Sequence, residues 1–401
     1  MIKQKIKRLI QKNHFWRTVG FDELSELYIS NLLRTTALAI FVVFVPFYLY
    51  QEGYSPAAIF VLFGFFLVTR VFADFGAGYF VARYGPKHSM IVSCVLQIVS
   101  VLLLLTVPTY HWSVLLLAIP WGAANSFFFI SYHTTFSKIK HTPKAGAELG
   151  HMQTYEKVGS LLGPLFGGIL GSLFGPAYIF LIATILFFSS LWPLFLTKEP
   201  VRLHQKLNFR SLPVKKIKND LIAYGFLGIE NTLCLNIWPL YVAVFILSGA
   251  VYAQLGALSG LGVLSAIIAA KAIGRLADSQ KARSVMRLSA LLNAVLYFVR
   301  PFVTNLAGVL AINVANETIT TGYRMPFVKG MYAAADDLPG HRIVYITVME
   351  AFSSVVKATT WFILALLATV VSLKTVLIVG FVIAGFASLG ILKERFTVYN
   401  R

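Results

Sequence analysis

Apolar runs of about 20 residues or more recur along the whole chain. A helix of that length crosses the hydrocarbon core of a bilayer, whereas irregular backbone exposed to lipid would leave N–H and C=O groups unsatisfied. Only 13% of the 401 residues are charged, about half the share found in a soluble domain. The sequence therefore predicts an all-α integral membrane protein that crosses the bilayer many times.

Twelve spans are predicted from these runs. The first is about 26 residues long and follows a charged arm, so we expect it to stay in the membrane rather than to be cleaved as a signal peptide. The predicted spans cover residues 24–49, 55–82, 87–106, 111–136, 148–173, 176–197, 219–247, 251–273, 285–303, 306–330, 342–370 and 373–393.

The basic residues are distributed unevenly across these spans. Of the 35 Lys and Arg residues, 29 fall on one side of the predicted membrane, whereas the opposite loops contain only Lys374. Such an asymmetry marks the cytoplasmic side. We therefore expect both termini in the cytoplasm, and we attribute the net charge of +19 to topology rather than to nucleic-acid binding.

Motifs of metal, nucleotide and nucleophile sites are missing from the sequence. Cys94 and Cys234 lie in separate spans, and no Cys-x-x-Cys motif or Cys/His cluster is present. His133 and His151 lie near the cytoplasmic boundary, where we expect an interfacial role rather than metal binding. Neither a glycine-rich nucleotide loop nor a serine elbow is found. The sequence predicts no enzyme, no cofactor and no metal.

A long basic segment in the middle of the chain divides the spans into two sets of six. The two sets resemble each other at an offset of about 195 residues, since Gly78 corresponds to Gly274 and Glu156 to Glu350. Internal repeats of this kind are common in transporters, with the substrate site at the repeat interface. The predicted regions are a basic arm at 1–20, a six-helix bundle at 21–197, a cytoplasmic loop at 198–218, a second six-helix bundle at 219–395 and a tail at 396–401. The arm either lies as an amphipathic helix on the anionic leaflet or serves as a charged tail that sets topology.

Six plus six spans with a basic central loop resemble the major facilitator superfamily, and a loop motif strengthens the resemblance. In that family the loop after span 2 reads G-x-x-x-D-R/K-x-G-R/K-R/K, and here Ala82 stands at the acidic position. The second half carries a degenerate copy after span 8. The matching residues are Gly78, Arg83, Gly85 and Lys87 in the first copy, and Gly274 and Asp278 in the second.

The predicted fifth span contains the segment GSLLGPLFGG, which matches G-x-x-x-G-P-x-x-G-G, a motif of proton-driven drug antiporters in this superfamily. The matching residues are Gly159, Gly163, Pro164, Gly167 and Gly168. Glycines four residues apart share one helix face and allow a neighbouring helix to approach closely, and Pro164 permits a bend. The motif therefore indicates either a helix that moves during antiport or a tight helix–helix contact with no bearing on transport.

A second antiporter motif is incomplete. Related drug antiporters place an arginine four residues before a glycine in span 4, but Ala118 occupies that position before Gly122. Either proton coupling uses other residues, or the protein is not coupled to protons.

Ionisable residues inside predicted spans are candidates for function, because a charge at the bilayer centre costs at least about 2.5–3.5 kcal/mol. They are Arg34, Arg70, Asp74, Glu156, Lys157, Glu230, Glu317, Glu350 and Lys357. The family resemblance implies that spans 1, 4, 7 and 10 line a central cavity. These four spans carry Arg34, Asn125, Glu230 and Glu317, respectively.

Spacing and depth predict some of the ion pairs. Arg70 and Asp74 are four residues apart on one helix, which favours a structural pair, and Arg34 lies at a depth that also allows pairing with Asp74. Glu350 and Lys357 share a face of span 11 and take part either in coupling or in ion pairs with another span.

Glu230 and Glu317 have no basic residue three or four positions away within their spans, so we expect them to be unpaired. Our hypothesis is that Glu230 exchanges a proton for substrate. The alternative is a structural carboxyl group hydrogen-bonded to Asn231 or Asn236.

The family resemblance implies a multi-pass transporter of small molecules that works by alternating access. The compact loops fit a bacterial inner membrane, and we expect a monomer. The favoured activity is proton-coupled efflux of amphipathic or cationic compounds. Two alternatives are an importer or uniporter of a polar nutrient such as a sugar or organic anion, and a non-transporting receptor or scaffold.

Overall fold

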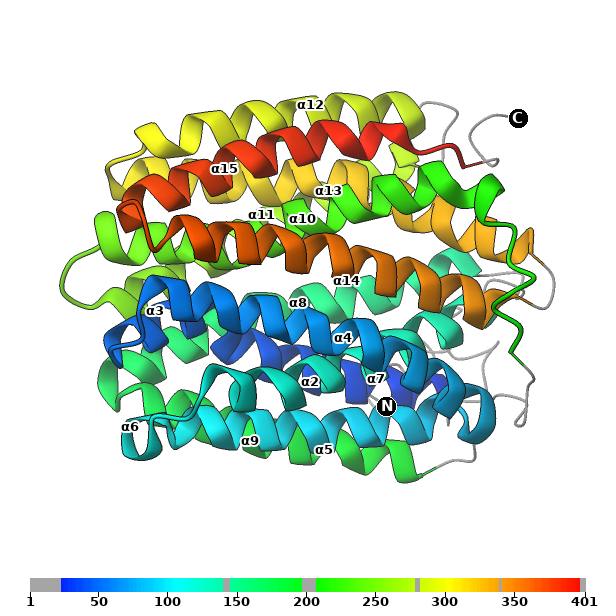
Figure 1. The fold of residues 1–401 in the computed structure, drawn as a ribbon, viewed down its shortest axis with the longest axis horizontal. Coiled ribbons are helices and arrows are strands. Elements are labelled where there is room, and N and C mark those ends of the chain that lie inside the picture. Colours follow the sequence, from blue (N-terminus) through cyan, green and yellow to red (C-terminus); the bar gives the residue numbers. More distant parts are fainter. Residues whose placement is uncertain (1–22, 140–144, 197–206, 278–281, 339–340, 397–401) are drawn as a thin grey trace, which may run out of the picture.

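The helices of the computed structural model lie side by side along the long axis of the molecule (Figure 1). The structure describes residues 23–139, 145–196, 207–277, 282–338 and 341–396, and all regular secondary structure in these ranges is helical. The elements are α2 (Glu23–Phe41), η2 (Val42–Phe44), α3 (Val45–Gln51), α4 (Pro56–Tyr84), α5 (Pro86–Leu105), α6 (Val107–Tyr110), α7 (Val114–Ile139), α8 (Ala145–Leu173), α9 (Pro176–Leu191), η3 (Trp192–Phe195), α10 (Val214–Phe245), α11 (Val251–Ala277), α12 (Ala282–Val299), η4 (Arg300–Phe302), α13 (Leu306–Asp336), α14 (Arg342–Leu367), α15 (Leu373–Gly390) and η5 (Ile391–Lys393).

Ten helical segments within the described ranges are long and apolar enough to cross a membrane. Helices α8 and α13 have spanning length, with 29 and 31 residues, but are not among the ten. Polar side chains along α13, among them Asn313, Asn316, Glu317 and Arg324, lower its hydropathy. Helix α13 thus supplies many of the polar groups in the interior of the C-terminal half.

Several helices differ in extent from the predicted spans. Helix α10 begins at Val214, so the end of the predicted cytoplasmic loop is helical, and α13 continues to Asp336 rather than ending at residue 330. The first predicted span is not one uninterrupted α-helix, because a short 3₁₀ segment separates α2 from α3 next to Pro46. The predicted arm at 1–20 lies outside the described residues.

Helices α2–α9 occupy the lower part of Figure 1 and α10–α15 the upper part, and we call these the N-terminal and C-terminal halves. Within the N-terminal half, α2 packs against α8 and α9, and α5 packs against α7 and α9. Within the C-terminal half, α12 packs against α13 and α15. The halves meet mainly along two pairs of helices, α4 with α14 and α8 with α11.

The contact between α4 and α14 extends along most of both helices. A Cβ atom at Gly64 would lie 2.7 Å from the Phe362 ring, and one at Gly78 would lie 2.8 Å from Thr347 Oγ1. These glycines are 14 residues apart, which corresponds to about 21 Å of helix. Glycine at both positions allows the two helices to approach closely. The halves therefore pack tightly along this long interface between α4 and α14, which we call the seam.

The glycines of α8 pack against two different helices. Gly159, Gly163 and Gly167 face α2, and a Cβ atom at Gly163 would lie 2.7 Å from the Ala39 carbonyl carbon. Gly168 faces α11, where a Cβ atom would lie 3.1 Å from Gly256 Cα. The predicted close packing is confirmed, but it involves two neighbours, one in each half.

The halves contact each other at both ends of the bundle. At the end where α3 stops, the Tyr252 hydroxyl donates to Gln51 Oε1 at 2.7 Å, and the Ala253 N–H donates to Ser172 Oγ at 2.9 Å. At the opposite end, His133 Nδ1 lies 2.7 Å from the Tyr332 hydroxyl. Opening either end requires that such contacts break.

Candidate functional site

Buried ionisable side chains gather in three places, one between the two halves and one inside each half. We distinguish three groups: the seam cluster around Arg70 and Glu350, the Glu230 network, and the Arg34 site.

The seam cluster joins α4 and α7 of the N-terminal half to α10 and α14 of the C-terminal half. Arg70 Nη2 lies 2.7 Å from Glu350 Oε2, and both side chains are buried. His133 Nε2 lies 3.4 Å from Glu350 Oε1, and the Tyr224 hydroxyl donates to the same oxygen. Glu350 thus interacts with three groups from three helices, and its strongest contact crosses between the halves.

This geometry corrects three predictions. Arg70 pairs with Glu350 of the other half rather than with Asp74 of its own helix. Arg34 does not pair with Asp74 either, because its guanidinium stacks on Phe128. His133 is buried against Tyr332 and Glu350 and is not an interfacial residue.

Asp74 is 0% exposed, and neither of its carboxylate oxygens has a hydrogen-bond partner among the residues described. The Ser126 hydroxyl lies beside it but donates to the Arg70 carbonyl oxygen at 3.3 Å. Lys357 is buried on α14, two turns after Glu350, and its ammonium is close enough to act electrostatically on Asp74. The cluster therefore contains two acids in very different surroundings.

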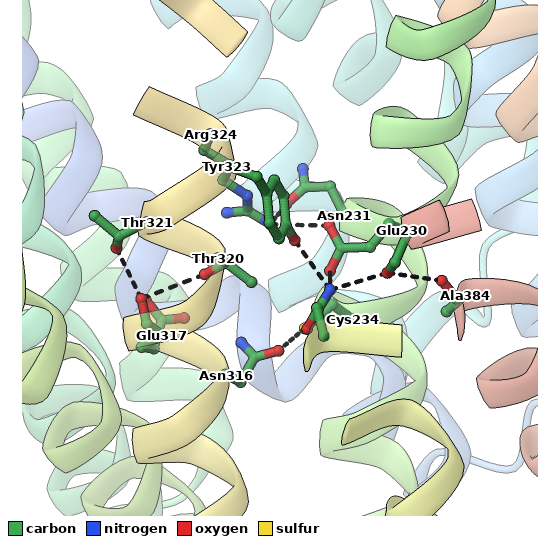
Figure 2. A network of polar contacts seen from close by, with 12 residues as sticks. Glu230, Asn231, Cys234, Asn316, Glu317, Thr320, Thr321, Tyr323, Arg324 and Ala384 are labelled. Carbon is green, nitrogen blue, oxygen red and sulfur yellow. Dashed lines mark hydrogen bonds and ion pairs between the residues drawn. The ribbon is translucent and has the colours of Figure 1, made fainter. Parts of the chain in front are cut away.

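The Glu230 network lies within the C-terminal half (Figure 2). Glu230 on α10 is fully buried and accepts hydrogen bonds from Asn293 at 3.2 Å and from the Tyr297 hydroxyl at 2.8 Å. Arg324 on α13 lies 3.5 Å from Glu230 Oε2 and donates to Asn231 Oδ1 at 2.6 Å. Glu230 is therefore well partnered.

The expectation that Glu230 is unpaired is wrong, and so is the alternative of a bond to Asn231 or Asn236. Asn231 accepts from Arg324, and Asn236 donates to the backbone carbonyl of Thr232. Arg324 lies 12 residues before the end of α13. The ion pair depends on a contact between residues 94 positions apart, which local spacing does not reveal.

Glu317 is also paired, contrary to the prediction. Its Oε2 lies 3.1 Å from Lys157 Nζ, so the pair joins α13 to α8 across the halves. The two side chains are 25% and 32% exposed, which makes this pair more accessible than the seam cluster. A partly exposed pair between the halves is well placed to open and close.

The Arg34 site lies inside the N-terminal half, between α2, α5 and α7. The Arg34 guanidinium carbon lies 3.3 Å from the centre of the Phe128 ring, and Nε and Nη2 have no hydrogen-bond partner within the described ranges. Arg34 is only 3% exposed. A small cavity beside it is lined by Leu27, Ser30, Asn31, Arg34, Met90, Cys94, Phe128 and Tyr132.

Two other polar side chains of the N-terminal half, Glu156 and Asn125, already have hydrogen-bond partners. Glu156 accepts hydrogen bonds from Asn31 at 2.9 Å and from Tyr132 at 2.6 Å. Asn125 on α7 donates to the backbone carbonyl of Trp121 at 3.0 Å. The guanidinium of Arg34 thus retains donors that the described residues do not use.

Arg300, which was not among the predicted site residues, is fully buried in η4. Its Nη2 lies 2.6 Å from Asn316 Oδ1, and its guanidinium carbon lies 4.0 Å from the centre of the Tyr297 ring. Its position near the end of the predicted span 285–303 gave no sign of burial. The only feature that could have pointed to its burial is that Arg300 lies inside the apolar run of this span.

The loop motif between α4 and α5 is largely structural in its contacts. Gly85 has φ +93° and connects the two helices, a conformation that favours glycine. Lys87 is buried and lies 3.1 Å from Glu26, whereas Arg83 is exposed and stacks on Tyr84 at 5.3 Å. In the second copy, Gly274 lies in the last turns of α11, and Asp278 lies outside the described residues.

The described residues contain no group of three or more His, Cys, Asp or Glu side chains that could hold a metal ion. Cys94 and Cys234 are both free and buried.

A sequence model of the Major Facilitator Superfamily matches residues 27–358. The chain belongs to this superfamily. It is therefore a multi-pass membrane protein of a transporter family that handles small molecules, and it is not an enzyme.

Curated relatives within the superfamily are similar at low identity. The multi-drug resistance efflux pump PmrA homolog of Lactococcus lactis is 26% identical over 178 residues, which is 40% of this chain and 42% of that protein. The multidrug resistance protein MdtG of Salmonella choleraesuis is 24% identical over 298 residues, which is 70% of this chain and 72% of that protein. The chain thus spans less than half the length of the first relative.

Among solved structures, the human organic anion transporter MFSD10 (TETRAN) matches with a TM-score of 0.68 at 11% identity. The match covers 92% of this chain and 98% of that one. At this identity the likeness shows a shared fold.

Proposed function

We propose that this protein is a secondary active exporter of small amphipathic or cationic molecules, driven by protons that move in the opposite direction. The observation that carries the proposal is the Arg70–Glu350 ion pair, buried at 2.7 Å between the two halves. A buried ion pair is weak support for stability alone, but a titratable pair on a moving interface links protonation to conformation. The relatives named as multidrug efflux proteins supply the expected direction and substrate class.

The proposed architecture has twelve spans in two six-helix bundles, 21–197 and 219–395, with both termini in the cytoplasm of a bacterial inner membrane. The two halves rock against each other as one end of the bundle opens and the other closes. Contacts at both ends support this, because opening must break either the Tyr252–Gln51 bond or the His133–Tyr332 bond. We take the protein to work as a monomer.

The test is proton-coupled flux in liposomes. Purified protein is reconstituted with a pH-sensitive dye inside, a proton gradient is imposed, and lipophilic cations are compared with sugars and organic anions. The proposal expects proton movement that depends on a lipophilic cation and opposes its flux, absent from protein-free liposomes. Substrate flux without proton movement would refute the coupling and identify a uniporter.

A second candidate function is transport of organic anions, favoured by the Arg34 site. Arg34 is a buried cation, and its Nε and Nη2 have no hydrogen-bond partner among the described residues. These two groups can donate a pair of hydrogen bonds to a carboxylate. The structural neighbour named as an organic anion transporter is consistent with this candidate.

Comparison of Arg34→Met with Arg83→Gln tests the anion candidate, since Arg83 is exposed at the end of α4. Anion binding should be lost in the first variant and kept in the second. Equal binding of organic anions by both variants would eliminate this candidate.

A further inference from the structure

Asp74 stands out within the seam cluster because it is buried without a hydrogen bond. Burying an ionised carboxylate without donors costs several kcal/mol, whereas a protonated carboxyl group avoids most of that cost. Asp74 is 0% exposed, neither of its oxygens accepts a hydrogen bond in the part of the chain that the structure describes, and the Ser126 hydroxyl beside it donates to the Arg70 carbonyl oxygen. In the closed arrangement of the two halves, this environment favours the neutral acid.

Glu350 has the opposite environment. Arg70, His133 and Tyr224 all contact its carboxylate, and the Arg70 pair at 2.7 Å is charge-assisted. Arg70 therefore forms its ion pair with Glu350, whereas Asp74 on the same helix acts on Arg70 electrostatically without an ion-pair contact. Both acids lie near Arg70, but while the two halves are in contact Arg70 forms its ion pair with Glu350.

When the halves separate, the acid that pairs with Arg70 changes. Arg70 and Asp74 both belong to α4 and are four residues apart, so they stay neighbours on one helix face in any arrangement. Glu350 and Lys357 both belong to α14 and leave together when that helix moves away. Once α14 has moved away, Asp74 is the nearest acid available to the Arg70 guanidinium.

We propose that Asp74 is the proton-binding residue of this transporter, and that Arg70 displaces its proton by moving from Glu350 to Asp74 when α4 and α14 separate. The O–H bond of the carboxyl group breaks, the proton passes to water, and the carboxylate pairs with Arg70. Reclosure of the seam returns Arg70 to Glu350 and makes Asp74 take up a proton again. This inference rests on the proposed function in one respect, which is that transport is coupled to protons.

The other groups that face Asp74 or its partners do not provide this exchange. Ser126 and His133 come from α7, and Tyr224 comes from α10. Ser126 is neutral, whereas His133 and Tyr224 contact Glu350 in the closed seam. Lys357 makes no ion pair with Asp74 and moves with α14.

Infrared spectroscopy of the purified protein in liposomes tests the proton site without any substrate. A protonated carboxyl group in an apolar environment has its own C=O stretching band, which disappears when the group ionises. The wild-type protein should show such a band that titrates with pH. Asp74→Asn should lose the band, whereas Asp337→Asn, at an exposed position after α13, should keep it. Persistence of the same titrating band in Asp74→Asn would overturn the proposal.

A double-variant cycle tests the role of Arg70. Glu350→Gln frees Arg70, so the midpoint of the band should move to lower pH by about one unit, a tenfold loss of proton affinity. Adding Arg70→Gln to Glu350→Gln should reverse this shift. An unchanged midpoint in Glu350→Gln, or a double variant that titrates like Glu350→Gln, would refute the exchange of Arg70. If Asp74→Asn fails to fold, Asp74→Glu supplies the second test, because it must shift the same band.

Transport measurements separate this inference from the proposed function. Asp74→Asn mimics the protonated acid, so it should lose gradient-driven accumulation but keep exchange of labelled for unlabelled substrate. If wild-type protein moves substrate without protons, the proposed coupling fails and Asp74 is not its proton site. If wild-type transport is proton-coupled and Asp74→Asn still accumulates substrate, only the present inference fails.

Discussion

The contact of Gly168 with Gly256 gives a quantitative prediction for Gly256→Ala. A Cβ atom at residue 256 would contact the Pro164 carbonyl oxygen and lie 3.0 Å from Gly168 Cα. Carbon atoms pack comfortably at about 3.5–4.0 Å, so α11 must move away from α8 by roughly 0.5–1 Å. This contact joins the two halves, so relief of the clash opens one end of the bundle.

Overpacking of this kind costs about 1–3 kcal/mol. Because the strain exists only while α8 and α11 are in contact, the open arrangement should gain population by a factor of about 5 to 150. The higher helix propensity of Ala over Gly applies to both arrangements and does not change their ratio. Gly76→Ala is the matched control, because nothing lies within 4 Å of a Cβ atom at that helical glycine.

Electron–electron distances between spin labels at Phe174 and Ala250 measure the opening. Both residues are exposed, and they lie just after α8 and just before α11. The distance distribution should move toward longer values in Gly256→Ala and stay like wild type in Gly76→Ala. Identical distributions in the two variants would refute the argument that this glycine contact holds the halves together.

Three further predictions concern the Lys157–Glu317 pair, the Tyr297 hydroxyl and the Glu394 carboxyl group. Lys157→Glu and Glu317→Lys should each impair transport, and the double exchange should restore it. The free energy of unfolding should change by only about 0–1 kcal/mol, because the pair is partly exposed. Absence of rescue in flux assays would count against a direct pairing. Tyr297→Phe should lower the free energy of unfolding by about 1.5–3 kcal/mol, measured in detergent, because it removes a donor to buried Glu230. Burial raises the pKa of Glu394, so the folded state holds that proton more tightly than the unfolded state. Its contribution to stability is therefore full at acidic pH and declines as pH rises through the raised pKa. Glu394→Gln should remove this decline in thermal melts across pH, and parallel curves for the two proteins would contradict it.

The sequence predicted those features that depend on local pattern. Apolar runs identified the helices, and the four-residue spacing of Gly159, Gly163 and Gly167 identified a face for close packing, which the structure places against α2. Helices α10 and α13 extend beyond the predicted spans, because polar residues continue them past the apolar runs.

The partners of the buried charges were not predictable in the same way. Depth along a helix follows from the rise per residue, but the neighbour at that depth depends on how the helices are arranged around each other. Arg70 was assigned to Asp74 because they are four residues apart, yet its partner Glu350 is 280 positions away. Glu230 likewise depends on Arg324 of another helix.

The division of the α8 glycines between two neighbours has a consequence for how this helix tolerates variation. Substitutions at Gly159, Gly163 or Gly167 disturb contacts inside one half and should reduce the amount of folded protein in a cell. Substitutions at Gly168 disturb a contact between the halves and should leave abundance intact while changing growth under a toxic substrate. A comprehensive variant library, scored once for abundance and once for survival, would therefore separate adjacent glycines of a single motif into two phenotypic classes.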